Sequence, residues 1–208
     1  MIKSASEIRS AARAALSGHW AEAAMLTFVY CIVAWAFSAL VGGLEYVQQG
    51  LGTVATLLML PLSWGYTVTF LSNARGENDP FNVSRIFDGY KDFGRIFITI
   101  LLMQVYTFLW TLLFIIPGII KSLSYAMTPF VLRDNPEMKN NEAIELSMKM
   151  MNGHKGDLFW VYLTFIGWGI LCIFTFGIGY FWFAPYVQAS TAQFYEEVKA
   201  EYEQKRER

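Results

Sequence analysis

Four long runs of the chain contain no charged residue, and they set the pattern of the sequence. The runs are Ala23–Leu44, Tyr46–Ala74, Ile96–Ile120 and Leu158–Tyr195. Uncharged apolar stretches of about 18 or more residues are typical of transmembrane helices. The pattern therefore predicts an all-α membrane protein that crosses the bilayer several times.

Two apolar stretches, Ile96–Leu132 and Leu158–Tyr195, are too long for one crossing each. At about 1.5 Å per residue, either one as a straight helix would approach twice the roughly 30 Å hydrocarbon core. Pro117-Gly118 interrupts the first stretch and Gly177-Ile178-Gly179 interrupts the second. Both stretches are therefore predicted to be helical hairpins.

The apolar runs together predict six transmembrane helices. Their expected ranges are about Ala23–Val41, Leu51–Leu71, Ile96–Ile116, Ile119–Leu132, Leu158–Thr175 and Ile178–Tyr195. Pro61 falls in the middle of the second range, where a kink is expected rather than a functional hinge. The charged segment 196–208 is predicted to continue the last helix.

The basic residues orient these helices. All Lys and Arg residues except Lys121 fall between or beyond the predicted hairpins, on one side of the membrane. Cytoplasmic loops carry an excess of Lys and Arg. Both termini are therefore predicted to be cytoplasmic.

A short amphipathic segment precedes each predicted hairpin. The first is a helix at Ser4–Leu16, in which Ser4 and Glu7 have the spacing of a capping box. Its apolar face suits the membrane surface or packing against the rest of the protein, and both alternatives remain open. The second segment is Phe81–Tyr90, and the third is a helix expected to start at Asn135-Pro136.

A glycine ends each amphipathic segment: Gly18, Gly89 and Gly153. Glycine alone adopts positive φ without penalty, so each is predicted to be a hinge between a surface helix and a span. The single domain 1–208 then contains three parallel repeats, about 1–76, 77–136 and 137–208. Three such units are able to close around a pseudo-threefold axis.

An acid follows each of these glycines: Glu22, Asp92 and Asp157. One hypothesis places these carboxylates in a ring at the inner mouth of a path, with Gln104 and Gln188 deeper in the membrane. The alternative is that each acid complements the dipole at the start of a span. The dipole alternative is favoured.

Other polar residues within the apolar regions favour structural roles over chemistry. His19 and His154 occupy matching positions, but Tyr90 stands in the third copy, which favours interfacial anchoring over a metal site. Lys121 is expected to snorkel outward rather than pair with Glu45 or bind an anionic headgroup.

Composition narrows the function classes further. Apolar residues make up 55% of the chain and charged residues 16%, well below the quarter typical of soluble proteins. No basic, aromatic-interleaved face indicates nucleic-acid binding, and no catalytic, cofactor or metal motif occurs. Cys31 and Cys172 are expected to be small buried apolar residues.

Several short stretches give the chain a resemblance to a known family. They include the segment Ile8–Leu16, Gly18-His19-Trp20, the segment Tyr125–Leu132, Gly153-His154-Lys155 and Ala184-Pro185-Tyr186. On these residues the chain resembles the bacterial membrane proteins of domain-of-unknown-function family nine-seven-five. It is distantly similar to the membrane domain of some glycerophosphodiester phosphodiesterases, without their catalytic domain. The resemblance implies a bacterial cytoplasmic-membrane protein with no assigned activity and hints at lipid association.

These features predict a non-enzymatic membrane protein that engages membrane lipids, or other membrane proteins, at the inner face of the membrane. The alternative is a small transporter or channel with a path along the pseudo-threefold axis. The sequence names no substrate, ligand or oligomeric state.

Overall fold

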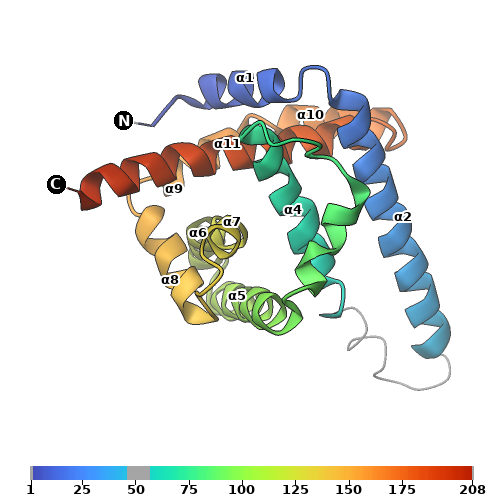
Figure 1. The fold of residues 1–208 in the computed structure, drawn as a ribbon, viewed down its shortest axis with the longest axis horizontal. Helices are drawn as coiled ribbons and strands as arrows, with labels where there is room; N and C mark the ends of the chain where they lie inside the picture. The colour runs from blue at the N-terminus through green and yellow to red at the C-terminus, as the bar shows by residue number, and fades with distance from the viewer. Residues whose placement is uncertain (1, 46–56, 208) are drawn as a thin grey trace.

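The computed structural model of the chain describes residues 2–45 and 57–207, and side chains within 2–39 and 57–207. The described residues form helices joined by short turns, with no strand among them (Figure 1). The elements are α1 (Ala5–Ala15), α2 (Trp20–Glu45), α4 (Leu60–Ala74), the 3-10 helix η1 (Val83–Tyr90), α5 (Phe93–Leu113), α6 (Ile115–Tyr125), α7 (Thr128–Asp134), α8 (Asn141–Met150), α9 (Lys155–Leu163), α10 (Ile166–Phe174) and α11 (Tyr180–Arg206).

The most deeply buried element is α4, which packs against η1, α11, α5 and α7. Phe70 and Leu71 are fully enclosed, and the indole of Trp64 donates a hydrogen bond to the Pro129 carbonyl at 2.9 Å. Pro61 lies in the first turn of α4, where its missing N–H costs no helical hydrogen bond. It therefore begins a helix and does not kink one. The first part of the predicted second span, residues 51–56, lies outside the described residues.

The amphipathic helix α1 is packed onto the protein. Its capping box between Ser4 and Glu7 is present as predicted. Ile8, Ala12 and Leu16 are buried, and α1 contacts α11 and α9. The apolar face of α1 is therefore covered by the rest of the protein, and not by lipid as the membrane-surface alternative would require.

The two predicted hairpins are helix pairs, but one turn lies elsewhere than expected. The break between α5 and α6 falls at Phe114, which is extended, rather than at Pro117-Gly118. Pro117 lies in the first turn of α6, where proline is tolerated, and Gly118 lets α6 approach Thr111 of α5 closely. The other break is at Gly177 as predicted, with φ of +84°.

The second and third amphipathic segments differ in part from the expected helices. In η1, Ile86 of the apolar stripe is buried, whereas Val83, Phe87 and Tyr90 are exposed. The expected helix start at Asn135-Pro136 is wrong, because α8 begins at Asn141.

Arg95 explains this late start. Its guanidinium donates to the carbonyl oxygens of Leu132, Asn135 and Met138 at 3.1 to 3.3 Å. These bonds hold residues 135–138 in an irregular conformation after α7 ends at Asp134, since a continuing helix would have used the same carbonyl groups itself.

The last helix is continuous from the apolar region into the charged end of the chain, as predicted. α11 runs from Tyr180 to Arg206. The packing continues beyond the apolar run, which ends at Tyr195, since Val198 is buried as well. The first span was expected to end at about Val41, but α2 continues to Glu45.

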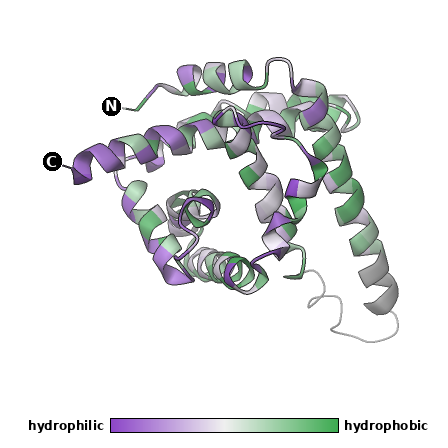
Figure 2. Cartoon of the chain, viewed as in Figure 1, coloured by the Kyte–Doolittle hydropathy of each residue, from purple (hydrophilic) through white to green (hydrophobic). Residues whose placement is uncertain are grey.

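Four helical stretches among the described residues are long and apolar enough to cross a membrane, which indicates a membrane protein. They are Trp20–Ala39, Phe93–Leu113, Ile115–Asp134 and Lys155–Phe174. Figure 2 shows the apolar character along α2. In Figure 1, α5 and α6 are seen nearly end-on, whereas α2 and α11 lie across the view. These helices do not share one direction, so the number of membrane crossings and the threefold repeat stay predictions.

Candidate functional site

Two of the three junction glycines have the backbone conformation expected of a sharp turn. Gly18 has φ of +87° and Gly153 has φ of +91°. In each junction the next residue, His19 or His154, donates its backbone N–H to the carbonyl three residues earlier. The two junctions therefore share one local structure, although their sequences differ around the Gly-His pair.

Gly89 is required for a different reason. It lies inside η1, and its φ is not positive. A Cβ atom at Gly89 would lie 2.2 Å from the carbonyl oxygen of Pro61, and one at Gly65 would lie 2.1 Å from that of Ile86. This glycine pair brings η1 against α4. The expected positive-φ hinge is therefore wrong for Gly89, and sequence reasoning missed Gly65.

Each of the three acids is bonded within its own junction. Glu22 lies 2.7 Å from the Nδ1 atom of His19, and Asp157 lies 3.4 Å from that of His154. Asp92 is paired with Arg95. All three carboxylates are more than half exposed. Glu22 and Asp157 lie in the first turns of α2 and α9, where a negative charge complements the helix dipole.

The acids and histidines do not converge as a metal centre requires. Within residues 2–45 and 57–207, no three His, Cys, Asp or Glu side chains are close enough to hold one ion. His154 instead links its junction to α11, since its Nε2 atom lies 3.4 Å from Glu201. His19 lies beside the ring of Phe81.

The remaining candidates lie apart from one another. Gln104 is exposed on α5, and Gln188 is half-buried on α11. Lys121 lies over the Trp110 ring, 5.0 Å from its centroid, a cation–π contact that the sequence did not suggest. Cys31 and Cys172 are half-buried thiols, and not fully buried as expected.

The most concentrated charge in the structure centres on Asp134, at the end of α7. Its carboxylate receives two hydrogen bonds from the Arg75 guanidinium at 2.7 Å, one from Lys199 at 2.6 Å and one from the Tyr195 hydroxyl at 2.8 Å. The Asp134 side chain is only 8% exposed. Its hydrogen bonds raise the pKa of Arg75 above the ordinary value. The group joins the ends of α4 and α7 to the middle of α11.

A second ion-pair group lies next to it. Glu77 receives hydrogen bonds from Arg133 at 2.6 Å and from Arg85 at 3.1 Å. Burial alone would raise the pKa of Glu77, but these hydrogen bonds and the charge of Arg133 outweigh it and lower the pKa. Arg133 also donates to the carbonyl of Val68. This group joins α4, α7 and η1.

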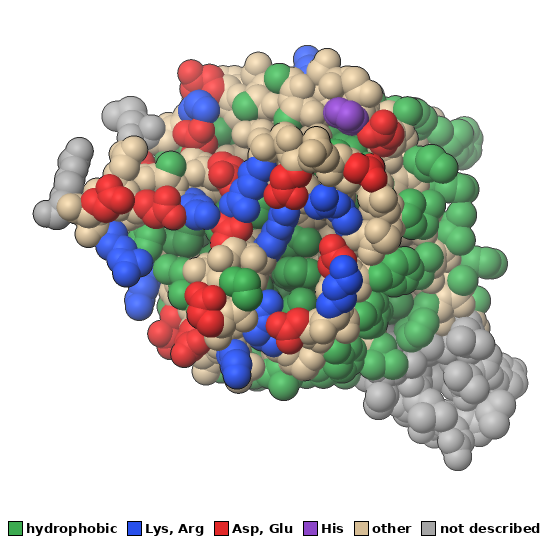
Figure 3. All heavy atoms as spheres, in the orientation of Figure 1, with side chains coloured by type: hydrophobic (Ala, Val, Ile, Leu, Met, Phe, Trp, Pro, Cys, Tyr) green, Lys and Arg blue, Asp and Glu red, His purple; other side chains and the backbone are tan. Residues whose placement is uncertain are grey.

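We call the surface formed by these two groups and the charged half of α11 the charged face. Figure 3 shows Lys, Arg, Asp and Glu side chains gathered there, with hydrophobic side chains along one flank. The sequence predicted that these charged residues lie on the same side of the membrane, but it did not predict which of them form ion pairs. The only local indication of pairing was the closeness of opposite charges in the sequence, as in Arg133-Asp134 and in Arg75 and Glu77.

A polar cavity of about 660 Å³ opens beside the charged face, between α8 and α11. Its charged lining residues are Asp134, Glu142, Glu145, Lys149, Lys199, Glu203 and Arg206. Asp134 and Lys199 are paired with each other. Glu145, Lys149 and Arg206 form no ion pair with any residue that the structure describes. The cavity therefore presents unpaired charges of both signs.

The sequence matches the family described as "Protein of unknown function (DUF975)" over residues 1–124 and 112–202. No curated protein and no solved structure matches the chain.

Proposed function

Because the chain belongs to the DUF975 family of proteins of unknown function, we propose its function from its sequence and structure. We propose a non-enzymatic protein of the bacterial cytoplasmic membrane that engages lipids or partner proteins through its charged face. In this proposal the chain crosses the membrane six times, with both termini in the cytoplasm.

The polar cavity between α8 and α11 is the observation that carries this proposal. Glu145 and Lys149 of α8 face Arg206 of α11 across it, without ion-pair partners among the residues described. Charged side chains pair readily with opposite charges on a ligand or partner. Both a zwitterionic or anionic headgroup and a charged segment of another protein meet this requirement.

The fold supports an inner-face location for the cavity. The apolar stretches that can enter a bilayer, such as α10, expose large hydrophobic side chains, and Phe176 beside it is 98% exposed. The basic residues of the charged face lie at the ends of helical stretches, as Arg133 does in Ile115–Asp134 and Arg75 does at the C-cap of α4. The positive-inside rule favours a cytoplasmic location for such a surface. The non-enzymatic part of the proposal rests on the sequence, in which no catalytic motif occurs.

No observation favours the transporter alternative. Its expected lining residues Glu22, Asp92 and Asp157 are each bonded within their own junctions, and Gln104 is exposed on α5. Solute flux that is lost when all three acids are neutralised would restore that alternative.

Photo-crosslinking in cells tests the proposal. A photo-reactive amino acid replaces Glu145, inside the cavity, and in a second protein replaces Glu137, an exposed acid that does not line it. We expect a lipid or protein adduct at position 145 and much less at 137. The combined charge reversal Lys149→Glu and Arg206→Glu is expected to reduce the adduct at 145. Equal yields at both positions, or none at 145, would overturn the proposal.

A further inference from the structure

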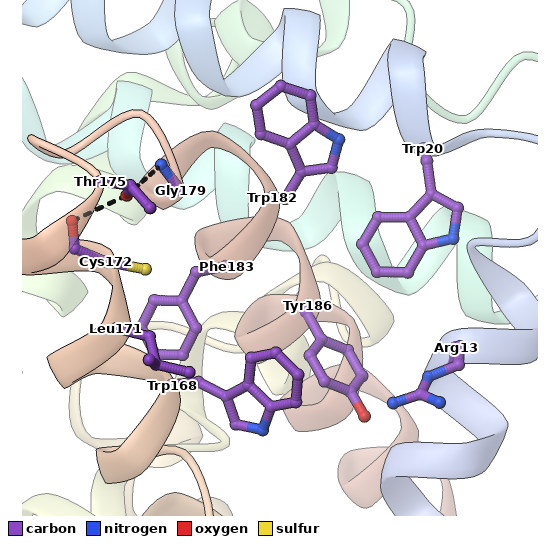
Figure 4. Close-up of a pocket in the computed structure, with 10 residues that line it drawn as sticks. All are labelled: Arg13, Trp20, Trp168, Leu171, Cys172, Thr175, Gly179, Trp182, Phe183 and Tyr186. Atoms are coloured by element: carbon purple, nitrogen blue, oxygen red, sulfur yellow. Dashed lines mark hydrogen bonds between the residues drawn. The ribbon is translucent and has the colours of Figure 1, made fainter.

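An apolar groove of about 340 Å³ lies on the opposite side of α11 from α8, where α10 and α11 meet the α1–α2 junction. Figure 4 shows Arg13 at one end of the groove and the α10–α11 turn at the other. Its lining residues are Arg13, Trp20, Trp168, Leu171, Cys172, Thr175, Gly179, Trp182, Phe183 and Tyr186.

The walls of the groove belong to a part of the chain that is suited to lipid contact. α10 has no buried residue, and it ends the apolar stretch Lys155–Phe174 that is long enough to cross a membrane. Trp168, Leu171 and Trp182 are each about half exposed. Apolar exposure of this extent on one surface marks an interaction site, and here it suits a hydrocarbon chain.

The Arg13 end of the groove carries an available positive charge. The guanidinium carbon of Arg13 lies 5.7 Å from the centroid of the Tyr186 ring, and the Trp20 ring lies beside the same tyrosine. Within the described chain, no carboxylate forms an ion pair with Arg13. In contrast, Arg75 and Arg95 are both paired with acids.

The aromatic residues at this end combine apolar rings with polar groups. Trp20 and Tyr186 lie beside each other there, and the N–H of a tryptophan usually finds a hydrogen-bond partner when it is buried. The indole N–H groups of Trp20 and Trp168 donate no hydrogen bond to any described residue, whereas Trp64 donates to a carbonyl. They are therefore available to the ester or phosphate oxygens of a lipid.

We propose that the groove binds one anionic phospholipid. Its acyl chain lies along Leu171 and Phe183, and its phosphate pairs with Arg13. A free phosphate would leave the apolar walls unused, and an uncharged lipid would leave Arg13 unpaired. A zwitterionic phospholipid would bring its own cation close to Arg13, which an anionic phospholipid does not. This proposal rests on the proposed membrane location, but the groove shares no lining residue with the polar cavity.

Fluorescence quenching by brominated lipids tests this site. The protein is reconstituted into phosphatidylcholine vesicles, and either brominated phosphatidylglycerol or brominated phosphatidylcholine is added in rising mole fraction. Bromine on an acyl chain in the groove quenches Trp168 and Trp182. We expect phosphatidylglycerol to quench at a mole fraction about tenfold lower than phosphatidylcholine, because the choline cation of phosphatidylcholine would be repelled by Arg13.

Three variants assign the preference to Arg13. Arg13→Gln is expected to remove the preference for phosphatidylglycerol over phosphatidylcholine. Arg13→Lys is expected to keep part of that preference because the positive charge remains. Lys139→Gln removes an exposed cation that does not line the groove, and it should behave as the unchanged protein.

The outcomes separate this proposal from the one on the polar cavity. Equal quenching by the two lipids, or the same preference in Arg13→Gln as in Lys139→Gln, would overturn the groove assignment. If Glu145 still crosslinks in that case, the cavity proposal stands. An Arg13-dependent preference supports the groove assignment even when position 145 gives no adduct.

Discussion

At the scale of single residues, glycine serves two different physical purposes in this fold. Gly18 and Gly153 are required because their φ angles are positive, and a side chain there has open space. Gly89 has an ordinary φ, but a side chain there would collide with the backbone of Pro61. The sequence predicted the first purpose for all three glycines, which is wrong for Gly89. It had no signal for the second, because close approach depends on which helix lies opposite.

Alanine substitutions distinguish the two purposes. Gly18→Ala and Gly153→Ala are expected to cost about 1 kcal/mol of unfolding free energy, since alanine is strained at positive φ. Gly89→Ala is expected to cost about 3 kcal/mol, because the carbonyl 2.2 Å away belongs to backbone. Denaturant titration of the purified protein followed by tryptophan fluorescence measures these differences.

Gly94→Ala is the matched control. Gly94 lies in α5, and nothing would lie within 4 Å of its Cβ atom, so its substitution should change stability by less than about 1 kcal/mol. A Gly89→Ala protein as stable as Gly94→Ala would contradict the packing of η1 on α4.

The charge of Asp134 offers a second test at this scale. Asp134→Asn leaves Arg75 and Lys199 without their shared partner near a largely buried position. We expect a loss of about 3 kcal/mol, the lower end of the cost of breaking a buried ion pair. Asp157→Asn, in an exposed pair, should cost less than about 1 kcal/mol. Equal losses in the two variants would contradict the central role of Asp134.

At the scale of elements, the hydrophobic pattern predicted which segments are helices better than it predicted where they end. The capping box of α1, the Gly177 break and the continuous last helix follow from local signals, and the structure has all three. The break at Phe114 and the late start of α8 do not follow from local signals. The break at Phe114 places Pro117 in the first turn of α6, where proline is tolerated. The late start of α8 depends on Arg95, which is distant in sequence.

The ends of α4, α7 and η1 are joined by Glu77, which predicts a dependence of stability on pH. The pKa of Glu77 is lowered from its ordinary value of 4.5, so the folded protein binds a proton on this group less readily than the unfolded chain. Its stabilisation is therefore fully present above about pH 4.5 and is lost as pH falls through the lowered pKa.

Glu77→Gln isolates this contribution. The variant should be less stable than the unchanged protein at pH 7, and the difference should shrink as pH falls below 4.5. Thermal unfolding at pH 7, 5 and 3.5 measures both effects. A difference that stays constant across this range would show that the Glu77 charge does not join these elements.

At the scale of the whole molecule, the segregation of charge was the most informative feature of the sequence. It predicted an all-helical membrane protein, and four apolar helical stretches in the described residues support that class. The charged groups around Asp134 and Glu77 were placed on one predicted side without their partners being foreseen. Pairing depends on how α4, α7 and α11 converge, which no local pattern contains.

The orientation of the chain across a membrane is the premise of both proposals, and α11 is the element that tests it. Its 27 residues would span about 40 Å, which exceeds the roughly 30 Å hydrocarbon core. Phe176, in the turn before α11, is almost fully exposed, and Arg206 lies at the opposite end of the helix. The proposed topology places these two positions on opposite sides of the membrane.

Labelling of single cysteines by a membrane-impermeant maleimide measures this most directly. Cys31 and Cys172 are first replaced by alanine, and one cysteine is then introduced, as Phe176→Cys or Arg206→Cys. We predict that position 176 reacts in intact cells and that position 206 reacts only after the membrane is permeabilised. Reaction of both positions from the same side would contradict the membrane-spanning arrangement.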